Sequence, residues 1–156
     1  MSLDPNLNSR LIVPAAGGLY RPLDGLADLL IRVTLGALLV PHGLQKLLGW
    51  FGGRGLAANT ALFDKIGYSP GWLWGNIVIG TEVLGGLLLI IGLWTRPAAL
   101  AIAIFALNAI VVTSAKGFFW SNGGSEYSIL LFVCALFVFI RGAGAYSVDR
   151  AIGREF

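Results

Sequence analysis

The sequence has few charged residues. Its length of 156 residues indicates a single domain. Asp, Glu, Lys and Arg make up 12% of the 156 residues, about half of the roughly 25% that is usual in a soluble domain. A soluble domain of this size needs more charged groups to cover its surface. The positive excess is scattered along the chain and forms no basic block, so the composition also argues against nucleic-acid binding.

Cysteine and histidine each occur once. Cys134 excludes an intramolecular disulfide, and its apolar surroundings, LLFVCALFVFI, indicate a small buried hydrophobic residue. His42 has no cysteine or carboxylate cluster near it in the sequence, so we predict no metal site, and haem held by two histidines of this chain is excluded by count. Iron–sulfur cysteine motifs and a dinucleotide fingerprint are also absent from the sequence. Electron transfer would therefore need a partner subunit or a borrowed cofactor.

Long apolar segments are abundant. Hydrophobic residues make up 56% of the chain, and the mean hydropathy is +0.79. A helix that crosses about 30 Å of hydrocarbon needs about 20 residues, and four segments approach or exceed that length: 26–48, 72–94, 97–115 and 126–145. We therefore predict an all-α integral membrane four-helix bundle over residues 24–150. An irregular N-terminal tail at 1–23 precedes it, and a short C-terminal tail at 151–156 follows.

The aromatic residues support membrane spans. Amphipathic Trp and Tyr rings gather at membrane–water interfaces. In this chain they fall at or just beyond the ends of the four segments, namely Trp50, Trp72, Trp74, Trp94, Trp120, Tyr68, Tyr127 and Tyr146. Phenylalanines lie inside the segments, at Phe105, Phe132, Phe137 and Phe139.

The distribution of Lys and Arg predicts the orientation. An even number of spans places both termini on one side of the membrane, and that side carries Arg10, Arg21, Arg96, Arg141, Arg150 and Arg154. The opposite side carries Lys46, Arg54, Lys65 and Lys116. Because cytoplasmic loops hold the excess of basic residues, we expect cytoplasmic termini and a bacterial inner-membrane location.

The loops between the spans differ in length. Only Thr95 and Arg96 separate the second span from Pro97, so spans two and three must form a tight antiparallel hairpin. The loop at 49–71 contains LAANTALFDKIG, which predicts a short amphipathic helix with Leu62, Phe63 and Ile66 on one side. We expect this helix to lie on the membrane surface.

Two ionisable residues fall well inside the predicted spans. Arg32 and Glu82 would each cost about 2.5 to 3.5 kcal/mol on insertion scales, so each needs a partner or a function. One interpretation is a structural ion pair, of Arg32 with Glu82 or with Asp28. The other is that Glu82 accepts protons in a buried pocket or hydrogen-bonds a small molecule.

Glycines on the first two spans predict how these spans pack. Arg32, Gly36, Leu39, Gly43 and Lys46 recur at steps of three and four, so they share one helix face. Two glycines on that face allow close approach of another helix backbone, and Gly85 and Gly86 lie beside Glu82 on the second span. We predict that spans one and two pack through these glycines.

Other polar residues lie within the spans or near their ends. His42 follows Pro41, which removes a helical hydrogen bond; it is either a ligand or proton-transfer residue, or a satisfied interfacial histidine. We interpret Lys46 and Trp50 as markers of the membrane boundary. Asn108 is either an interhelical hydrogen-bonding residue or a site residue. Glu126 begins span four on the same membrane side as His42, favourably placed against the helix dipole.

Several stretches together resemble the DoxX family of small four-helix membrane proteins. They are RVTLGALLVPHGLQKLLGWFGG, GTEVLGGLLLIIGLWTRPAAL, NGGSEYSILL and RGAGAYSVDR, which cover about residues 23–150 in the family's order. The resemblance implies a link to quinone-dependent oxidation or to oxidative-stress assemblies. The family's recurrent polar positions correspond to His42, Lys46, Glu82, Glu126, Ser147 and Asp149.

The leading hypothesis is an accessory or quinone-site subunit of a membrane redox system. Glu82, His42 and Glu126 would handle protons, and Lys46, Trp74 and Asn108 would line a pocket for a quinone or a similar amphiphile. Other membrane or redox subunits, or further copies of this chain, would be its partners. The alternatives are a non-catalytic anchoring subunit and a carrier of a small solute or lipid.

Overall fold

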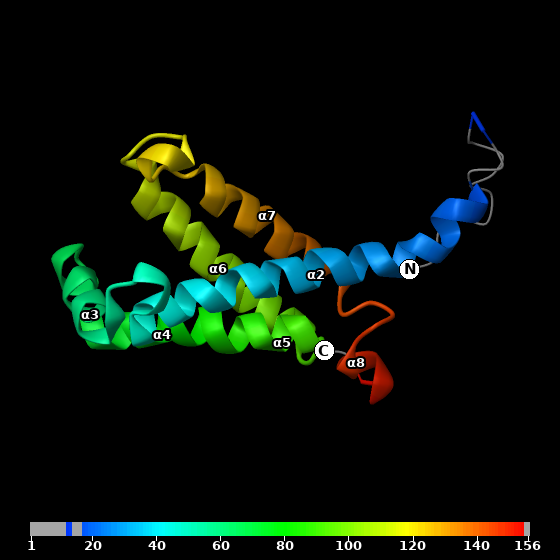
Figure 1. The fold of residues 1–156 in the computed structure, drawn as a ribbon, viewed down its shortest axis with the longest axis horizontal. Coiled ribbons are helices and arrows are strands. Elements are labelled where there is room, and N and C mark those ends of the chain that lie inside the picture. The colour runs from blue at the N-terminus through cyan, green and yellow to red at the C-terminus, as the bar shows by residue number, and fades with distance from the viewer. Residues whose placement is uncertain (1–11, 14–16, 155–156) are drawn as a thin grey trace.

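The computed structural model describes residues 12–13 and 17–154, and within them the chain is helical, with no strand (Figure 1). This confirms the all-α prediction. The elements in chain order are α2 (Gly17–Leu48), η2 (Trp50–Gly52), α3 (Gly55–Lys65), α4 (Gly71–Gly80), η3 (Thr81–Gly85), α5 (Gly86–Ile91), α6 (Thr95–Ser114), η4 (Trp120–Asn122), α7 (Glu126–Arg141) and α8 (Val148–Ala151). Arg10, the rest of residues 1–11, residues 14–16 and residues 155–156 lie outside the described residues.

Three helices within the described part of the chain are long and apolar enough to cross a membrane. They are Gly25–Leu48, Gly71–Ile91 and Thr95–Ser114, which match the first three predicted spans to within a few residues. The second is continuous from α4 through the π-helical turn η3 to α5, because the junction residues Gly80, Thr81, Gly85 and Gly86 keep right-handed helical angles.

The fourth predicted span is shorter than expected. Helix α7 has 16 residues, which at 1.5 Å per residue cover about 24 Å, less than the roughly 30 Å of a hydrocarbon core. It ends at Arg141 because Gly142 takes φ 83° and ψ −160°, outside the helical region. A fourth membrane crossing at 126–145 therefore stays a prediction.

The first helix begins earlier than expected. Helix α2 starts at Gly17, so residues 17–23, which we predicted to be irregular, are helical. Leu19, Leu23, Leu26 and Leu30 are exposed and recur at steps of three and four. The helical periodicity of the span therefore continues upstream of its predicted start.

Helix α2 packs closely against η3 and α5 through glycines, as predicted. A Cβ atom at Gly36 would lie 2.4 Å from the carbonyl oxygen of Gly86, and one at Gly86 would lie 2.9 Å from that of Gly36. A Cβ atom at Gly43 would lie 3.1 Å from the Cβ of Glu82. These contacts set the register of the two antiparallel helices: Gly36 lies opposite Gly86, and Gly43 lies opposite Glu82.

The predicted ion pairs of Arg32 are wrong, and the register gives the reason. Arg32 lies one turn before Gly36 in α2. Because the two helices are antiparallel, its guanidinium reaches the end of α5, where it donates to the carbonyl oxygens of Leu89 and Ile90, the latter at 3.1 Å. Glu82 is seven or eight residues away along that helix, which is roughly 10 Å. Asp28 instead binds Arg141 of α7 through two hydrogen bonds, of 2.9 and 2.7 Å.

The C-terminal segment closes the same end of the bundle. Arg32 also donates to the carbonyl oxygen of Tyr146. Asp149 is 1% exposed, and its two carboxylate oxygens accept hydrogen bonds from the backbone N–H groups of Trp94 and Thr95 at 2.8 and 2.9 Å. Asp149 thereby caps the start of α6. We call the region of Arg32, Asp149 and their backbone partners the closed end.

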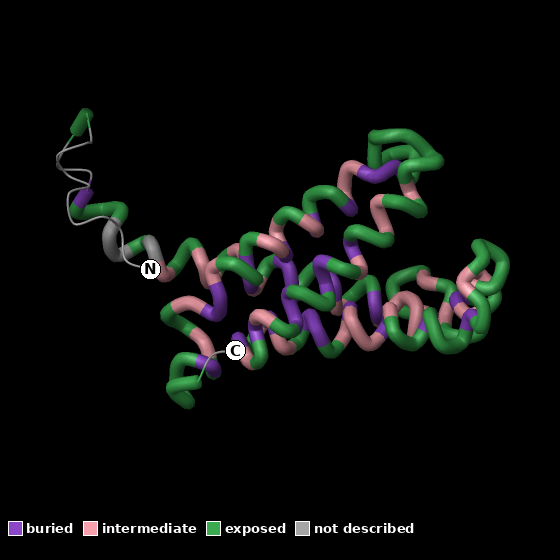
Figure 2. The backbone as a smooth tube through the Cα atoms, turned by 180° about the vertical axis from the view of Figure 1, so that it is seen from behind, coloured by how far each residue is buried: buried purple, intermediate pink, exposed green. Residues whose placement is uncertain are grey.

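The core lies where α2, α5, α6 and α7 cross. Figure 2 shows most buried positions in the middle of the molecule. The largest side chains of this core are Leu35, Leu39, Leu89, Ile102, Leu131 and Val138. Alanines fill the contact between α6 and α7, at Ala99, Ala103, Ala106 and Ala135. Away from the closed end, the α6–α7 pair diverges from the α2–α4 pair toward the end that carries η4 and α3 (Figure 1).

Candidate functional site

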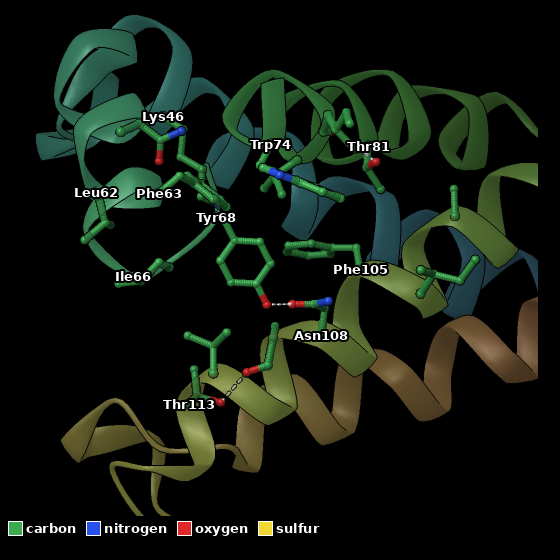
Figure 3. Close-up of a pocket in the computed structure, with 17 residues that line it drawn as sticks. Lys46, Leu62, Phe63, Ile66, Tyr68, Trp74, Thr81, Phe105, Asn108 and Thr113 are labelled. Carbon is green, nitrogen blue, oxygen red and sulfur yellow. Dashed lines mark hydrogen bonds between the residues drawn. The ribbon is translucent and has the colours of Figure 1, made fainter. Parts of the chain in front are cut away.

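A pocket of about 550 Å³ lies at the end where the helices diverge (Figure 3). Its walls come from α3, from α4 with η3, and from α6, and Lys46 of α2 also lines it. Most lining side chains are apolar, and a few polar groups stand among them. This combination is typical of small-molecule sites, in which apolar walls supply contact area and a few polar groups fix orientation.

Helix α3 forms one wall of the pocket. The structure confirms the predicted short helix, but its apolar residues Leu62 and Phe63, with Ile66 just beyond it, line the pocket. They face the pocket because α3 folds back onto α4 and α2, with Gly71 so close that a Cβ there would lie 2.2 Å from the carbonyl oxygen of Thr60. That the helix lies on the membrane surface stays a prediction.

Aromatic rings line the pocket. Tyr68 meets Trp74 edge-on with ring centroids 5.8 Å apart, and it meets Phe63 in the same way at 6.0 Å. The Phe105 ring lies 5.8 Å from the Lys46 ammonium nitrogen. Edge-to-face pairs and a cation near a ring are favourable arrangements. They leave flat apolar surfaces against which a ring-shaped ligand can pack.

Lys46 binds Glu82, which corrects our interpretation of Lys46 as only a boundary marker. The Lys46 ammonium donates to Oε1 of Glu82, whose side chain is 3% exposed, whereas that of Lys46 is 29% exposed. The second oxygen, Oε2, is buried and has no hydrogen-bond partner within the described residues. Glu82 sits in the π-helical turn η3, a local distortion that is frequent at functional sites.

Asn108 and Tyr68 join two walls of the pocket. The Tyr68 hydroxyl, in the loop before α4, donates a hydrogen bond to Oδ1 of Asn108 on α6 (Figure 3). The partner of Asn108 is therefore a loop residue and not another helix, as the interhelical interpretation expected, and Asn108 also lines the pocket. The structure brings Lys46, Trp74 and Asn108 together in one lining, although that they bind a ligand stays a prediction.

Asn59 is a buried polar residue of the pocket that the sequence analysis missed. It lies on α3, is 4% exposed, and its Nδ2 has no hydrogen-bond partner within the described residues. A Cβ at Gly75 of α4 would lie 3.2 Å from this nitrogen. The available signal was an asparagine among apolar and small residues in LAANTALF, but helix periodicity alone did not separate it from a solvent-facing residue.

His42 and Glu126 lie outside the lining of the pocket. The His42 side chain is exposed, and its ring packs against Tyr127 of α7 with centroids 5.9 Å apart. Oε2 of Glu126 accepts a hydrogen bond of 3.1 Å from the backbone N–H of Trp120, which braces the loop between α6 and α7. Tyr127 is close enough to Glu82 for the two to interact electrostatically.

Ser147 and Asp149 serve the closed end. The Ser147 hydroxyl donates to the carbonyl oxygen of Gly144 at 2.9 Å and accepts from the Arg150 N–H at 3.3 Å, capping α8. Neither residue lines the pocket. The recurrent polar positions that the sequence suggested therefore divide between two ends of the molecule.

Comparisons with known proteins identify a family and several relatives of this chain. The family model described as DoxX matches residues 27–115, a range that contains every residue lining the pocket. A protein of Bacillus subtilis named "Putative oxidoreductase CatD" is 29% identical over 106 residues, which cover 68% of this chain and 73% of that protein. The "Inner membrane protein YqjF" of Escherichia coli is 27% identical over 143 residues, which cover 87% of this chain and 99% of that protein. No solved structure matches the chain.

Proposed function

The chain belongs to the DoxX family of membrane proteins, and we propose that it is a quinone-site subunit of a membrane redox system. The observation that carries the proposal is the pocket of about 550 Å³ between α3, α4 and α6. Two of its walls belong to candidate membrane spans, so a lipid-soluble ligand can reach it from the bilayer. The name of the Bacillus subtilis relative is consistent with a redox role.

The residues present fit a quinone. Trp74, Tyr68 and Phe105 offer flat surfaces to a ring, and the Lys46 ammonium offers donors to its carbonyl oxygens. A bound quinone would supply two-electron chemistry coupled to protons, with the electrons coming from a partner subunit. Glu82, buried beside Lys46 with one oxygen unpartnered, would hold and exchange the proton on the protein side.

The proposed membrane arrangement is a four-helix one with cytoplasmic termini in the bacterial inner membrane. Helix α7 packs along α6 more extensively than any other pair of elements, and such packing would carry it across the bilayer beside α6. The name of the Escherichia coli relative supports the location. In this orientation the closed end faces the cytoplasm, and the pocket lies in the opposite half of the membrane.

An anchoring role through glycine-rich faces has less support. Gly36, Gly43, Gly85 and Gly86 are all buried within this chain, and the first two lie against the second span. The glycine face that would have to bind a partner helix is therefore already used inside the protein.

Filling the pocket tests the proposal. Ala109 lines the pocket from α6, so Ala109→Phe would place a ring in the ligand's volume, whereas Leu107 on the same helix is 51% exposed and lies outside the lining. The protein would be purified in lipid nanodiscs without detergent, and its bound molecules extracted and identified by mass spectrometry. We expect quinone in the wild type and in Leu107→Phe, and roughly tenfold less in Ala109→Phe, a loss of about 1.4 kcal/mol of binding free energy. Phospholipid alone in all three samples would contradict the proposal.

A further inference from the structure

The loop between α6 and α7 carries three adjacent aromatic residues whose side chains are largely exposed. Phe118, Phe119 and Trp120 are 56%, 63% and 69% exposed. The rings of Phe118 and Phe119 meet edge-on, with centroids 5.4 Å apart. We call these three residues the aromatic tip, and it lies at the end of the molecule away from the closed end (Figure 1). A cluster of large exposed apolar side chains marks a surface that binds an apolar phase or a partner.

The backbone beside the aromatic tip satisfies its own hydrogen bonds. The N–H of Gly124 donates to the carbonyl oxygen of Phe119 at 3.0 Å, and that of Glu126 donates to the carbonyl oxygen of Phe118 at 2.8 Å. The N–H of Trp120 donates to Oε2 of Glu126 at 3.1 Å. Hydrocarbon excludes backbone polar groups that lack partners. These groups have partners, so the folded tip can enter the boundary of a bilayer at little cost.

Helix α7 is too short to span a bilayer by itself, and the missing length falls beside the tip. Its 16 residues cover about 24 Å, which is roughly 6 Å less than a hydrocarbon core. Its C-terminal end is fixed to the closed end, because Arg141 binds Asp28 of α2. The shortfall therefore lies at the N-terminal end of α7, where the loop joins it. Residues that flank a short span can make up such a difference.

We propose that the aromatic tip inserts into the phospholipid interface of the outer leaflet and completes the apolar length of the α6–α7 hairpin. Aromatic side chains favour the boundary between headgroups and acyl chains. Lys116, just beyond α6, is exposed and can extend its ammonium to the phosphate groups. The inference rests on the membrane arrangement in the proposed function and does not depend on the ligand. Because α6 is also a wall of the pocket, the tip holds that wall at a fixed depth in the bilayer.

A nitroxide label at position 121 measures the depth of the tip. Ser121 follows Trp120 in η4 and is exposed, and Cys134→Ala removes the one native thiol. In phosphatidylcholine nanodiscs, oxygen concentrates inside the bilayer, whereas a water-soluble nickel chelate stays outside it. We expect the label on Ser121→Cys to collide more often with oxygen than with the chelate. Ala151→Cys, at an exposed position of α8, is the control and should show the reverse order.

A triple variant tests whether the tip completes the span. Phe118→Ser, Phe119→Ser and Trp120→Ser together remove exposed side chains and keep the backbone hydrogen bonds, so the fold should be retained. In thick dioleoylphosphatidylcholine nanodiscs, this variant should unfold several degrees below the wild type, because serines would occupy the region that α7 does not reach. In thin dilauroylphosphatidylcholine nanodiscs, which α7 spans by itself, the two proteins should unfold at nearly the same temperature.

Each contrary result has a definite meaning. More collisions with the chelate than with oxygen at position 121 would place the tip in water and overturn the inference. Few collisions with either reagent would show that protein covers the tip, as at an interface between two copies, and would also overturn it. Equal destabilisation of the triple variant in thick and thin bilayers would show that the tip does not complete the span. The label at position 121 decides the inference if the triple variant fails to fold, and the quinone extraction with Ala109→Phe tests the proposed ligand separately.

Discussion

The two ends of the molecule use a cationic side chain from the same face of α2 in different ways. At the closed end, Arg32 is 1% exposed and donates to three backbone carbonyl oxygens, with Asp149 near enough to attract it electrostatically. At the pocket end, the Lys46 side chain is 29% exposed and binds one carboxylate oxygen of Glu82. Arg32 and Lys46 are 14 residues apart, close to four helical turns.

The difference follows from the two side chains. The planar guanidinium of arginine presents several donors in a fixed fork, which suits the neighbouring carbonyl groups of Leu89 and Ile90 where α5 ends. Lysine is a compact charge on a flexible chain, and it can bind a carboxylate while keeping donors for a ligand. The closed end therefore stabilises the fold, and the pocket end keeps polar groups that are free to bind a ligand.

Removing Asp149 should have the largest effect on stability. Asp149→Ala leaves the N–H groups of Trp94 and Thr95 without their carboxylate acceptor and Arg32 without its nearby negative charge. We expect the free energy of unfolding in mixed detergent micelles to fall by about 3 kcal/mol. Arg150→Ala is the control, because Arg150 is an exposed neighbour in α8 and should cost less than about 0.5 kcal/mol. Equal stability of the two variants would contradict a structural role for the closed end.

Breaking the Lys46–Glu82 pair should lower the stability less than Asp149→Ala does, and it should also weaken ligand binding at the pocket. Lys46→Met leaves Glu82 buried with neither oxygen partnered, and we expect a loss of about 1 to 3 kcal/mol in the same unfolding assay, below the loss for a fully buried pair. The double variant Lys46→Met with Glu82→Gln should recover most of that loss, because no charge is left unpaired. Its affinity for decylubiquinone should stay roughly tenfold lower than that of the wild type, since the ammonium donors are absent.

The double variant also separates two roles for Glu82. Recovery of stability without recovery of binding would show that the pair contributes to ligand binding in the pocket. Full recovery of binding would show that the pair only balances two charges. A double variant as unstable as Lys46→Met would contradict the pairing itself.

Helix positions and the glycine seam could be predicted from the sequence because both depend on short-range periodicity. The steps of three and four from Gly36 to Gly43 place both glycines on one face, and the structure puts that face against Gly86 and Glu82. The partners of Arg32 could not be predicted in the same way. They depend on the register between two helices and on a C-terminal segment that returns from more than 110 residues away.

The pocket was predicted only in part, for a related reason. Lys46 and Trp74 stood out near span ends, and Asn108 stood out as a lone amide within the third span. Asn59 did not, because its burial depends on α3 folding back onto α4, where Gly71 and Gly75 allow close approach. A single polar residue in so short a helix has no sequence signal that distinguishes it from a solvent-facing one.

The smallest expected effect is at His42, which lies one helical turn before Lys46. Its ring packs against Tyr127 with centroids 5.9 Å apart at an interplanar angle of 43°, and it lies outside the pocket lining. His42→Phe keeps an aromatic ring in that contact, so we expect a change in the free energy of unfolding below about 0.5 kcal/mol. Decylubiquinone affinity should stay within about twofold of the wild type.

His42→Leu, which removes the ring, serves as the matched variant and should differ from His42→Phe only by the lost contact with Tyr127. Unchanged binding in both variants would show that the polar groups that bind the ligand lie only on the side of α2 that faces Glu82. A loss of binding in both variants would contradict that division. It would show instead that the imidazole acts on Glu82 across Tyr127, which lies within electrostatic range of that carboxylate, and the pocket end would then extend to the far side of α2.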